Sequence, residues 1–432
     1  MHSAPAQTCL DLAFDLADMG QTDQAVFLLE QLVTHRPDQA IAMVFYTLAY
    51  LKRQIGEDDT KALSAAEAAE IGDAFPLRPG ELKALLSAPP SSRTKELAGN
   101  LFYAKRNIDA ARACFEEALR LNPENPTVMR NLAVLYFNYD HAVSADRALE
   151  LMRRAVALRP DSKELVYETV VLMDKLAKPP KEKIAFLREH AAQTDRDDIQ
   201  TELAKAYNQA GEPDAALSVL KKRQFVPCEG GEHAIADQYL FAYFQKGYAQ
   251  LAAGNAAAAL ELFRTAQVLP QNLGAGIWNH CKLIPCRYFE AVALQRLGQT
   301  EDAEKIYRYI TETKIDYFSN MFLKELPFYQ ALSYDRLGEH LKGVHLMTTY
   351  RRVWEDALGQ TDSGYFGTTP FFIPFTDSPS AMRRAQYSYL CGLCEDYMGH
   401  AARAAELWSL AAGLNSELQF SAFYAEKGIL AE

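Results

Sequence analysis

The sequence has no stretch of about 18 apolar residues, so no segment is typical of a membrane-spanning helix. It also lacks any run of lysine and arginine, since 45 basic side chains face 56 acidic ones across 432 residues, for a net charge of −11. Nonspecific binding to nucleic acid or to anionic membrane requires basic patches. We therefore expect no nucleic-acid partner and no membrane partner. Residues 1–12 lack the apolar core of a signal peptide, which favours a cytoplasmic location.

Motifs for catalysis and cofactor binding are missing as well. The sequence contains no phosphate-binding glycine loop, no HExxH metal site and no nucleophile elbow. Its seven cysteines are scattered, which fits a reducing compartment. Cys391 and Cys394 form a CxxC inside a helical pattern without a second such pair, so core packing is favoured over a zinc site, and the same holds for Cys281 and Cys286. We expect no catalytic residue, no metal and no cofactor.

A phrase with fixed internal spacing recurs along the chain instead. A small residue is followed seven positions later by a turn residue, usually glycine, and five positions after that by another small residue. Such a repeat predicts an array of helix pairs, because closely crossing helices need small side chains and a short turn favours a residue that tolerates positive φ. The copies are Ala13/Gly20/Ala25, Gly99/Arg106/Ala111, Ala204/Gly211/Ala216, Gly247/Gly254/Ala259, Ala291/Gly298/Ala303, Ala331/Gly338/Gly343 and Gly392/Gly399/Ala404.

The copy at residues 99–123 is the most specific. Gly99-Asn100-Leu101-Phe102-Tyr103, with Ala111, Phe115, Ala118 and Pro123, resembles the consensus of the tetratricopeptide repeat (TPR). The copy that follows fits only if about three residues are inserted in its turn, within 139–144. The resemblance implies an all-α fold, a right-handed superhelical solenoid of about ten TPR-like helix pairs.

Proline, glycine and aromatic residues divide this array into segments. We expect N-terminal repeats at 1–72, a proline-rich connector at 73–93, a central array at 94–358, an aromatic loop at 359–379, and a C-terminal repeat with a capping helix at 380–432. In the capping helix, Phe420, Phe423 and Tyr424 are expected to pack on the helix of Trp408. The aromatic loop either caps the last repeats or forms a lid over a groove.

Two connectors are too long and glycine-rich for simple repeat turns. One spans 225–233 and carries Glu229 and Glu232 on either side of two glycines; the other spans 270–280 and carries Asn272, Trp278 and His280. Because both follow the second helices of adjacent repeats, we expect them at the same edge of the array, within reach of each other. These side chains are candidates for binding a polar ligand, although Glu229 and Glu232 would equally stabilise the N-terminus of the next helix.

The same connectors carry a second resemblance, which covers nearly the whole chain. Phe225, Pro227 and Glu229-Gly230-Gly231-Glu232, followed by Pro270 and Asn272-Leu273-Gly274, are similar to motifs in the C-terminal half of large bacterial proteins. In those proteins a β-sandwich domain of unknown function precedes a TPR array. The resemblance implies a bacterial protein and a possible β-sandwich partner domain. This sequence departs from the motifs at Cys228, His233 and Ala275, which puts a shared ligand chemistry in doubt.

An aromatic residue stands three positions before the small residue in four consecutive repeats. In TPR arrays this position lies on the first helix of each pair, and here it holds Phe244, Tyr288, Phe328 and Tyr389, with Arg130 in an earlier repeat. One interpretation is an aromatic row that binds a peptide or a sugar chain, with Arg130 and Asn100 as polar contacts. The other is packing between helices.

Two hypotheses follow. The first is a noncatalytic TPR scaffold that mediates protein–protein or domain–domain interaction, with a protein or peptide partner, and we favour it. The second is an accessory module that binds or processes carbohydrate, with its site in the glycine-rich connectors.

Overall fold

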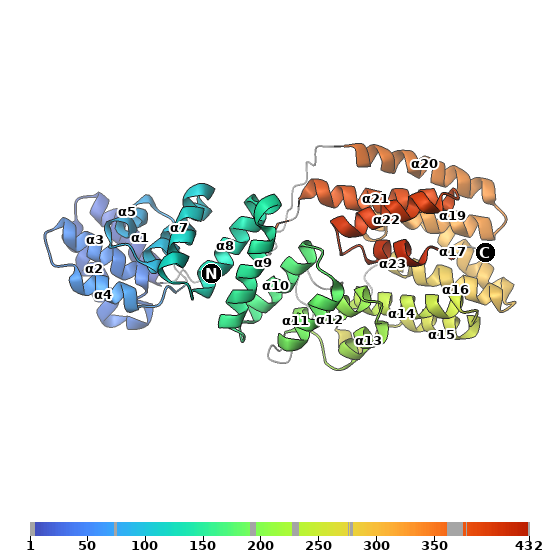
Figure 1. Ribbon diagram of the computed structural model, residues 1–432, viewed down its shortest axis with the longest axis horizontal. Helices are drawn as coiled ribbons and strands as arrows, with labels where there is room; N and C mark the ends of the chain where they lie inside the picture. Colours follow the sequence, from blue (N-terminus) through green and yellow to red (C-terminus); the bar gives the residue numbers. More distant parts are fainter. Residues whose placement is uncertain are drawn as a thin grey trace. The chain divides into compact units, whose positions relative to one another are not determined.

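The computed structural model describes residues 5–72, 76–190, 196–226, 233–274, 276, 280–360, 375–376 and 378–430. Within these ranges the regular structure is helical, with no strand, as the sequence predicts. The chain divides into two compact units, Met1–Arg159 (unit 1) and Pro160–Glu432 (unit 2) (Figure 1). Each unit has its own buried apolar core.

Unit 1 is built from consecutive helix pairs. Its helices are α1 Pro5–Asp18, α2 Thr22–His35, α3 Ala42–Gln54, α4 Thr60–Ala68, α5 Pro79–Ser87, α6 Ser92–Ala104, α7 Ile108–Leu121, α8 Pro126–Tyr139 and α9 His141–Leu158. Each first helix packs on its second, as α6 does on α7 and α8 on α9. The helix α5 lies within the segment predicted as a connector, where it packs on α3 and α6. The expected insertion near residue 140 does not enlarge the turn: a single residue, Asp140, separates α8 from α9, and the additional residues lengthen α9.

Unit 2 continues the same pattern. Its helices are α10 Lys163–Lys175, α11 Pro180–His190, α12 Asp197–Gln209, α13 Pro213–Lys221, α14 Ala234–Ala252, α15 Ala256–Ala266, α16 Ile284–Arg296, α17 Thr300–Glu312, α18 Tyr317–Phe322, α19 Leu326–Arg336, α20 His340–Gly359, α21 Pro379–Tyr397, α22 Ala401–Leu414 and α23 Gln419–Lys427. Short 3₁₀ helices, η2 Gln271–Leu273 and η3 His280–Leu283, lie between α15 and α16.

The turns inside the pairs have the backbone that the repeated phrase predicts. The turn glycines adopt the left-handed conformation, with φ of 79° at Gly20, 72° at Gly211, 82° at Gly254, 77° at Gly298, 76° at Gly338 and 84° at Gly399. Arg106, which replaces glycine in its copy, adopts the same conformation with φ of 61°. The turn geometry is therefore fixed by the helix pair and is imposed even on a residue with a side chain.

The small residue on the first helix also has the predicted role. A Cβ on Gly99, Gly247 or Gly392 would lie 2.5 to 2.7 Å from ring atoms of an aromatic side chain on the second helix. Those rings belong to Phe115, Phe263 and Trp408, all of which are buried. The glycine of each pair therefore provides the space that the partner ring fills.

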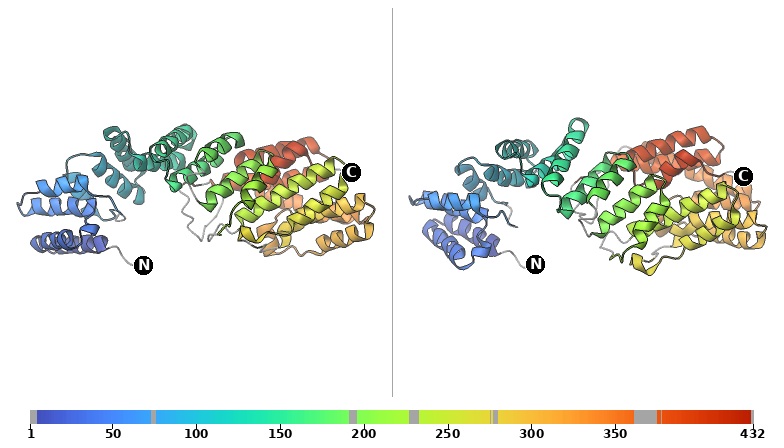
Figure 2. Two further views of the ribbon diagram at one scale, coloured as in Figure 1. Left: turned by 90° about the horizontal axis from the view of Figure 1, so that it is seen from below. Right: turned by 60° about the horizontal axis from the view of Figure 1, so that its bottom comes forward.

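The last helix does not simply cover the end of the array. In unit 2, α23 lies between the α21–α22 pair and the helices α14 to α16 (Figure 1), and the further views show the C-terminal helices beside those of the middle of the chain (Figure 2). The ring of Phe420 lies 4.8 Å from that of Phe244 on α14, and the hydroxyls of Tyr424 and Tyr329 on α19 are 2.9 Å apart. Tyr424 also packs on Trp408, as predicted, at 5.6 Å between ring centroids. The chain's own C-terminal helix therefore covers the surface formed by α14, α19 and α22, which is the inner surface of unit 2.

Candidate functional site

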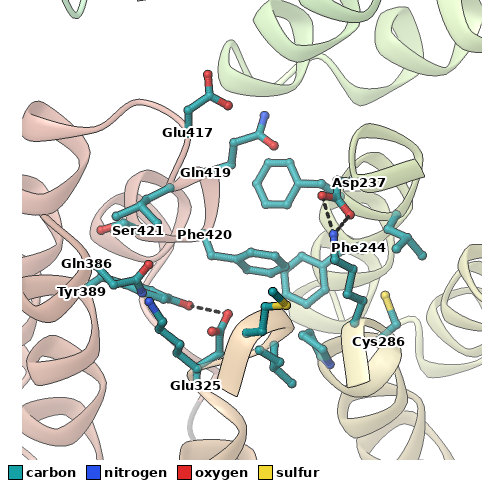
Figure 3. Close-up of a pocket in the computed structure, with 18 residues that line it drawn as sticks. Asp237, Phe244, Cys286, Glu325, Gln386, Tyr389, Glu417, Gln419, Phe420 and Ser421 are labelled. Atoms are coloured by element: carbon teal, nitrogen blue, oxygen red, sulfur yellow. Dashed lines mark hydrogen bonds and ion pairs between the residues drawn. The ribbon is translucent and has the colours of Figure 1, made fainter. Parts of the chain in front are cut away.

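A pocket of ≈ 330 Å³ opens in unit 2 beside the start of α23 (Figure 3). Five parts of the chain form it: α14, the η3–α16 segment, the end of α18 with the residues before α19, α21, and the start of α23 with the connector that leads into it. The lining residues are Asp237, Leu240, Phe241, Phe244, Lys282, Pro285, Cys286, Met321, Leu323, Lys324, Glu325, Gln386, Tyr389, Glu417, Leu418, Gln419, Phe420 and Ser421. Small-molecule and peptide sites in proteins have this combination of an apolar lining with a few polar groups.

Aromatic rings form the apolar part of the pocket. The ring centroid of Phe420 lies 5.0 Å from that of Phe241 and 4.8 Å from that of Phe244, both in edge-to-face contact. Phe241 and Phe244 are buried in the core, whereas Phe420 keeps part of its surface exposed. A planar or branched apolar group that entered the pocket would therefore meet ring faces and edges that are already held in place.

The acidic side chains that line the pocket have partners. Nζ of Lys282 lies 2.8 Å from both carboxylate oxygens of Asp237 (Figure 3). The Tyr389 hydroxyl donates to Oε1 of Glu325 at 3.5 Å. Burial raises the pKa of Glu325, and burial together with the nearby Glu325 carboxyl raises the pKa of Tyr389 well above its ordinary value. Both groups therefore stay protonated to higher pH than they would in water.

Two polar side chains of the pocket have no partner among the described residues. Neither the Lys324 ammonium nor the Gln386 amide makes a hydrogen bond or an ion pair with them, although the charge of Lys324 lowers the pKa of the adjacent Glu325 carboxyl and so opposes the effect of its burial. Both side chains are half-buried. An amide and an ammonium in the lining of the same pocket can donate hydrogen bonds to a ligand.

A cluster of charges, largely buried except for the exposed Glu417, holds the connector that enters the pocket. Lys205 on α12 contacts Oδ2 of Asp174 at 2.8 Å, Oε2 of Glu202 at 2.6 Å and Oε1 of Glu417 at 2.7 Å. Lys183 on α11 also donates to the Asp174 carboxylate. Burial raises the pKa of Glu202 to about 8, and the nearby Asp174 and Glu417 carboxylates act in the same direction. Protonated Glu202 leaves two carboxylates facing two ammonium groups, so the charges of the cluster balance.

The aromatic row predicted from the repeats is buried. Relative exposures are 0% for Phe244, 3% for Tyr288, 0% for Phe328 and 2% for Tyr389. Tyr288 and Phe328 are enclosed in the core, as the packing interpretation expects. Phe244 and Tyr389 differ because an edge of each also borders the pocket. The row is therefore part of the core, and two of its members reach the candidate site.

Two other candidates lie in unit 1. Nδ2 of Asn131 donates to Oδ1 of Asn100 at 3.0 Å, and Nη1 of Arg130 lies 3.3 Å from Oδ1 of Asn131. Asn100 comes from α6 and Arg130 from α8, so Asn131 joins adjacent first helices. Asn100 and Arg130 therefore use some of their hydrogen-bonding groups within the protein, and those groups are not available to a ligand.

The described ends of the two glycine-rich connectors meet, as predicted, and Asn272 makes the contact. Its Nδ2 donates to the carbonyl oxygens of Leu220 and Arg223, both at 2.8 Å, and its own carbonyl accepts a hydrogen bond from the Phe225 amide at 2.8 Å. The hydrogen bonds of Asn272 therefore join the two connectors. His280 begins η3 and is exposed. Glu229, Glu232 and Trp278 lie outside the described residues, as do Tyr365, Phe366, Phe371 and Phe372 of the aromatic loop, whereas Phe375 is buried.

The cysteine pair is part of the core of unit 2. Cys391 and Cys394 on α21 are both buried, and burial raises the pKa of the Cys391 thiol to about 12. Within the described ranges no group of three or more metal-ligating side chains comes together. Over the same ranges, no helix is long and apolar enough to cross a membrane.

Sequence reasoning did not find the pocket. Its donors, Lys324 and Gln386, belong to no motif and are 62 positions apart, and its aromatic wall is completed by α23. The one sequence pattern that concerns it is the phenylalanine and tyrosine content of 420–424, which favours a helix that caps the array.

The comparisons with known proteins concern mainly the repeat. Residues 97–163 match the family model described as tetratricopeptide repeat. The human "Interferon-induced protein with tetratricopeptide repeats 2" is 29% identical over 126 residues, which are 28% of this chain and 26% of that protein. The human "Protein IFIT1 homolog B" is 32% identical over 124 residues, 27% of this chain and 26% of that protein. The match thus spans about a quarter of the length of these curated relatives.

Solved structures of other proteins align with the chain at low TM-scores. The crystal structure of YrrB, "a TPR protein with an unusual peptide-binding site", aligns with a TM-score of 0.30 and 19% identity over 40% of this chain and 83% of that one. The "Human IFIT1 dimer with PPP-AAAA" aligns with a TM-score of 0.29 and 16% identity over 96% of this chain and 91% of that one. The family match thus identifies a tetratricopeptide repeat at residues 97–163, and the helix pairs of the described residues give the chain an all-α fold.

Proposed function

We propose that this chain is a noncatalytic interaction scaffold, and that unit 2 binds a short peptide segment of a partner protein in the pocket beside α23. One observation carries the proposal. The inner surface of unit 2 already holds a peptide segment of the chain itself, residues 416–424, through a carboxylate on Lys205 and aromatic side chains on α14. The pocket remains open next to that segment and offers the same kinds of contact.

The arrangement of polar groups favours binding over catalysis. The thiol of Cys286 faces the pocket, but burial raises its pKa to about 12, so the nucleophilic thiolate is scarce at neutral pH. The carboxylate of Asp237 is bound by Lys282 through both oxygens. The Tyr389 hydroxyl does contact the Glu325 carboxyl, but burial raises the pKa of Tyr389 well above its ordinary value, so its nucleophilic phenolate is scarce at neutral pH.

Selection from a random peptide display library on the purified full chain tests this function. We expect linear peptides whose binding is lost when the pocket is filled by Cys286→Met or Gln386→Trp. The variant Arg308→Trp on α17, outside the pocket, is the matched control and is expected to bind as the wild type does. Absence of enriched peptides, or equal binding to pocket-filled variants, would overturn the proposal.

Two alternative ligands are included as counter-screens. An oligosaccharide panel addresses the carbohydrate hypothesis, although the Asn272 amide assigned to it already donates to two backbone carbonyls. A single-stranded RNA oligonucleotide addresses the nucleic-acid partner that the acidic composition argues against. Binding of either with the pocket filled would place the function elsewhere on the chain.

A further inference from the structure

We infer that the pocket beside α23 recognises a peptide carboxylate that adjoins a large apolar side chain, with Lys324 and Gln386 as the groups that bind the carboxylate. This inference rests on the proposed function and specifies its ligand.

The pairing of charges in the pocket gives the sign of the ligand. Each of the three acidic side chains in the lining has a partner: Asp237 has Lys282, Glu325 has the Tyr389 hydroxyl, and Glu417 has Lys205. Among the basic side chains of the lining, Lys282 is paired, whereas Lys324 makes no ion pair in the described part of the chain. The charged side chain of the lining that has no ion pair or hydrogen bond among the described residues is therefore the Lys324 ammonium. An anionic ligand would complement this cation.

A second donor in the pocket lining, the Gln386 amide, favours an anion that accepts several hydrogen bonds. Gln386 also lacks a partner among the described residues, and it lies on the same side of the pocket as Tyr389 (Figure 3). A carboxylate has two oxygens with about four acceptor positions, so it can take hydrogen bonds from an ammonium and an amide together. Charge-assisted bonds of this kind are stronger than neutral ones.

The aromatic wall determines what the carboxylate is attached to. Phe241, Phe244 and Phe420 form a continuous apolar surface within the same pocket. A volume of ≈ 330 Å³ lies at the small end of ligand pockets, which suits one or two residues rather than a long segment. A small hydrophilic acid would leave this apolar surface uncovered, whereas a large apolar side chain next to the carboxylate would cover it.

The chain's own C-terminal segment already uses this combination. In residues 417–420 the carboxylate of Glu417 binds Lys205, and the ring of Phe420, three residues later, packs on Phe244. A ligand with a carboxylate on Lys324 and an apolar group against the aromatic side chains of the lining would repeat that combination within the open pocket.

Four fluorescent peptides of otherwise identical sequence test the inference on the full chain. Each carries a phenylalanine followed by glutamate or glutamine as its last residue, with either a free C-terminus or an amide. The glutamate amide and the glutamine acid each present one carboxylate from a different source, and the glutamine amide presents none. We expect the peptides with a carboxylate to bind about tenfold more tightly than the glutamine amide, and their order identifies the side chain or the C-terminus as the source.

Two variants assign the effect to the pocket. Lys324→Gln is expected to abolish the preference, so that the peptides bind within about twofold of one another, and Gln386→Leu is expected to reduce it. Neither residue makes an internal hydrogen bond among the described residues, so both variants should unfold at the wild-type temperature. Lys305→Gln, on the exposed surface of α17, is the matched control and should keep the full preference.

Several results would overturn the inference. They are equal binding of the glutamine amide to the wild type, equal loss for all four peptides in Lys324→Gln, and no binding by any of them. If library selection nevertheless enriches pocket-dependent peptides without a carboxylate, the proposed function stands and the ligand chemistry is wrong. If selection enriches nothing, both fail.

Discussion

The hydroxyl oxygens of Tyr329 and Tyr424 lie 2.9 Å apart in the interior of unit 2, where they join α19 to the C-terminal helix α23. Both side chains are almost completely buried. Because neither hydroxyl is accessible to water, each depends on the other for a hydrogen bond.

Replacing only one of these tyrosines should lower the free energy of unfolding by more than half of the loss caused by replacing both. Tyr424→Phe leaves the Tyr329 hydroxyl buried and unpaired, so we expect a loss of about 1–3 kcal/mol in the free energy of unfolding, and Tyr329→Phe should behave alike. The double variant removes both polar groups and should be less destabilised than the sum of the single variants. Urea unfolding of the four proteins measures the coupling, and strictly additive losses would contradict it.

The glycine on a first helix should not tolerate even a methyl group where an aromatic ring fills the space. A Cβ on Gly247 would lie 2.7 Å from Cε1 of Phe263, so Gly247→Ala should destabilise unit 2 by about 1–3 kcal/mol. Adding Phe263→Leu should recover part of this loss by removing the ring. Gly413 on α22 is the control because a Cβ there meets nothing within 4 Å, and Gly413→Ala should be neutral or stabilising. Thermal unfolding distinguishes these outcomes.

Glu202 should make the stability of unit 2 depend on pH. Its pKa rises from an ordinary 4.5 to about 8 in the folded chain, so the folded state holds a proton that the unfolded state has lost in this interval. Stability should therefore be greatest at the acidic end of the interval and fall as pH rises toward 8, by roughly several kcal/mol, because each pKa unit corresponds to about 1.4 kcal/mol.

Glu202→Gln removes the titrating group and should flatten this dependence above pH 5. Glu261→Gln, on the exposed surface of α15, should keep the wild-type slope. The comparison requires the free energy of unfolding from urea titrations at several pH values between 5 and 8.5. A variant that retains the wild-type slope would show that another group is responsible.

Asn272 should prove to be a structural residue. Its amide donates to the carbonyls of Leu220 and Arg223, so Asn272→Ala is expected to lower the free energy of unfolding by about 1–2 kcal/mol. Asn272→Asp should cost more because a carboxylate would face two carbonyl oxygens. If the alanine variant unfolds like the wild type but binds an oligosaccharide differently, Asn272 contacts carbohydrate and the structural role is wrong.

The fold could be predicted from the sequence because its determinants are local. The spacing between Gly247, Gly254 and Ala259 is set by one close helix crossing and one turn, so it recurs wherever a pair forms, and even Arg106 adopts the turn conformation. The meeting of the two glycine-rich connectors was also predictable, since adjacent repeats place them at one edge.

The candidate site could not be predicted in this way. It depends on where α23 returns within unit 2, and that is determined by contacts such as Lys205 with Glu417, which are 212 positions apart. No repeat period encodes such a pairing. The sequence pattern of 420–424 is apolar whether the helix covers the end of the array or its inner surface, so burial alone left both arrangements open.

The long return of the chain also has a consequence for the order of events during synthesis. In an ordinary helix-pair array each repeat can fold on the one before it as soon as it emerges. Here Asp174 receives a hydrogen bond from Ser416, which is made 242 positions later. At about 5–20 residues per second, roughly 10 to 50 seconds separate the two residues at the ribosome. During that interval the charged cluster of α10 to α12 lacks its contacts with Ser416 and Glu417. We therefore expect nascent unit 2 to complete its native fold only at the end of translation.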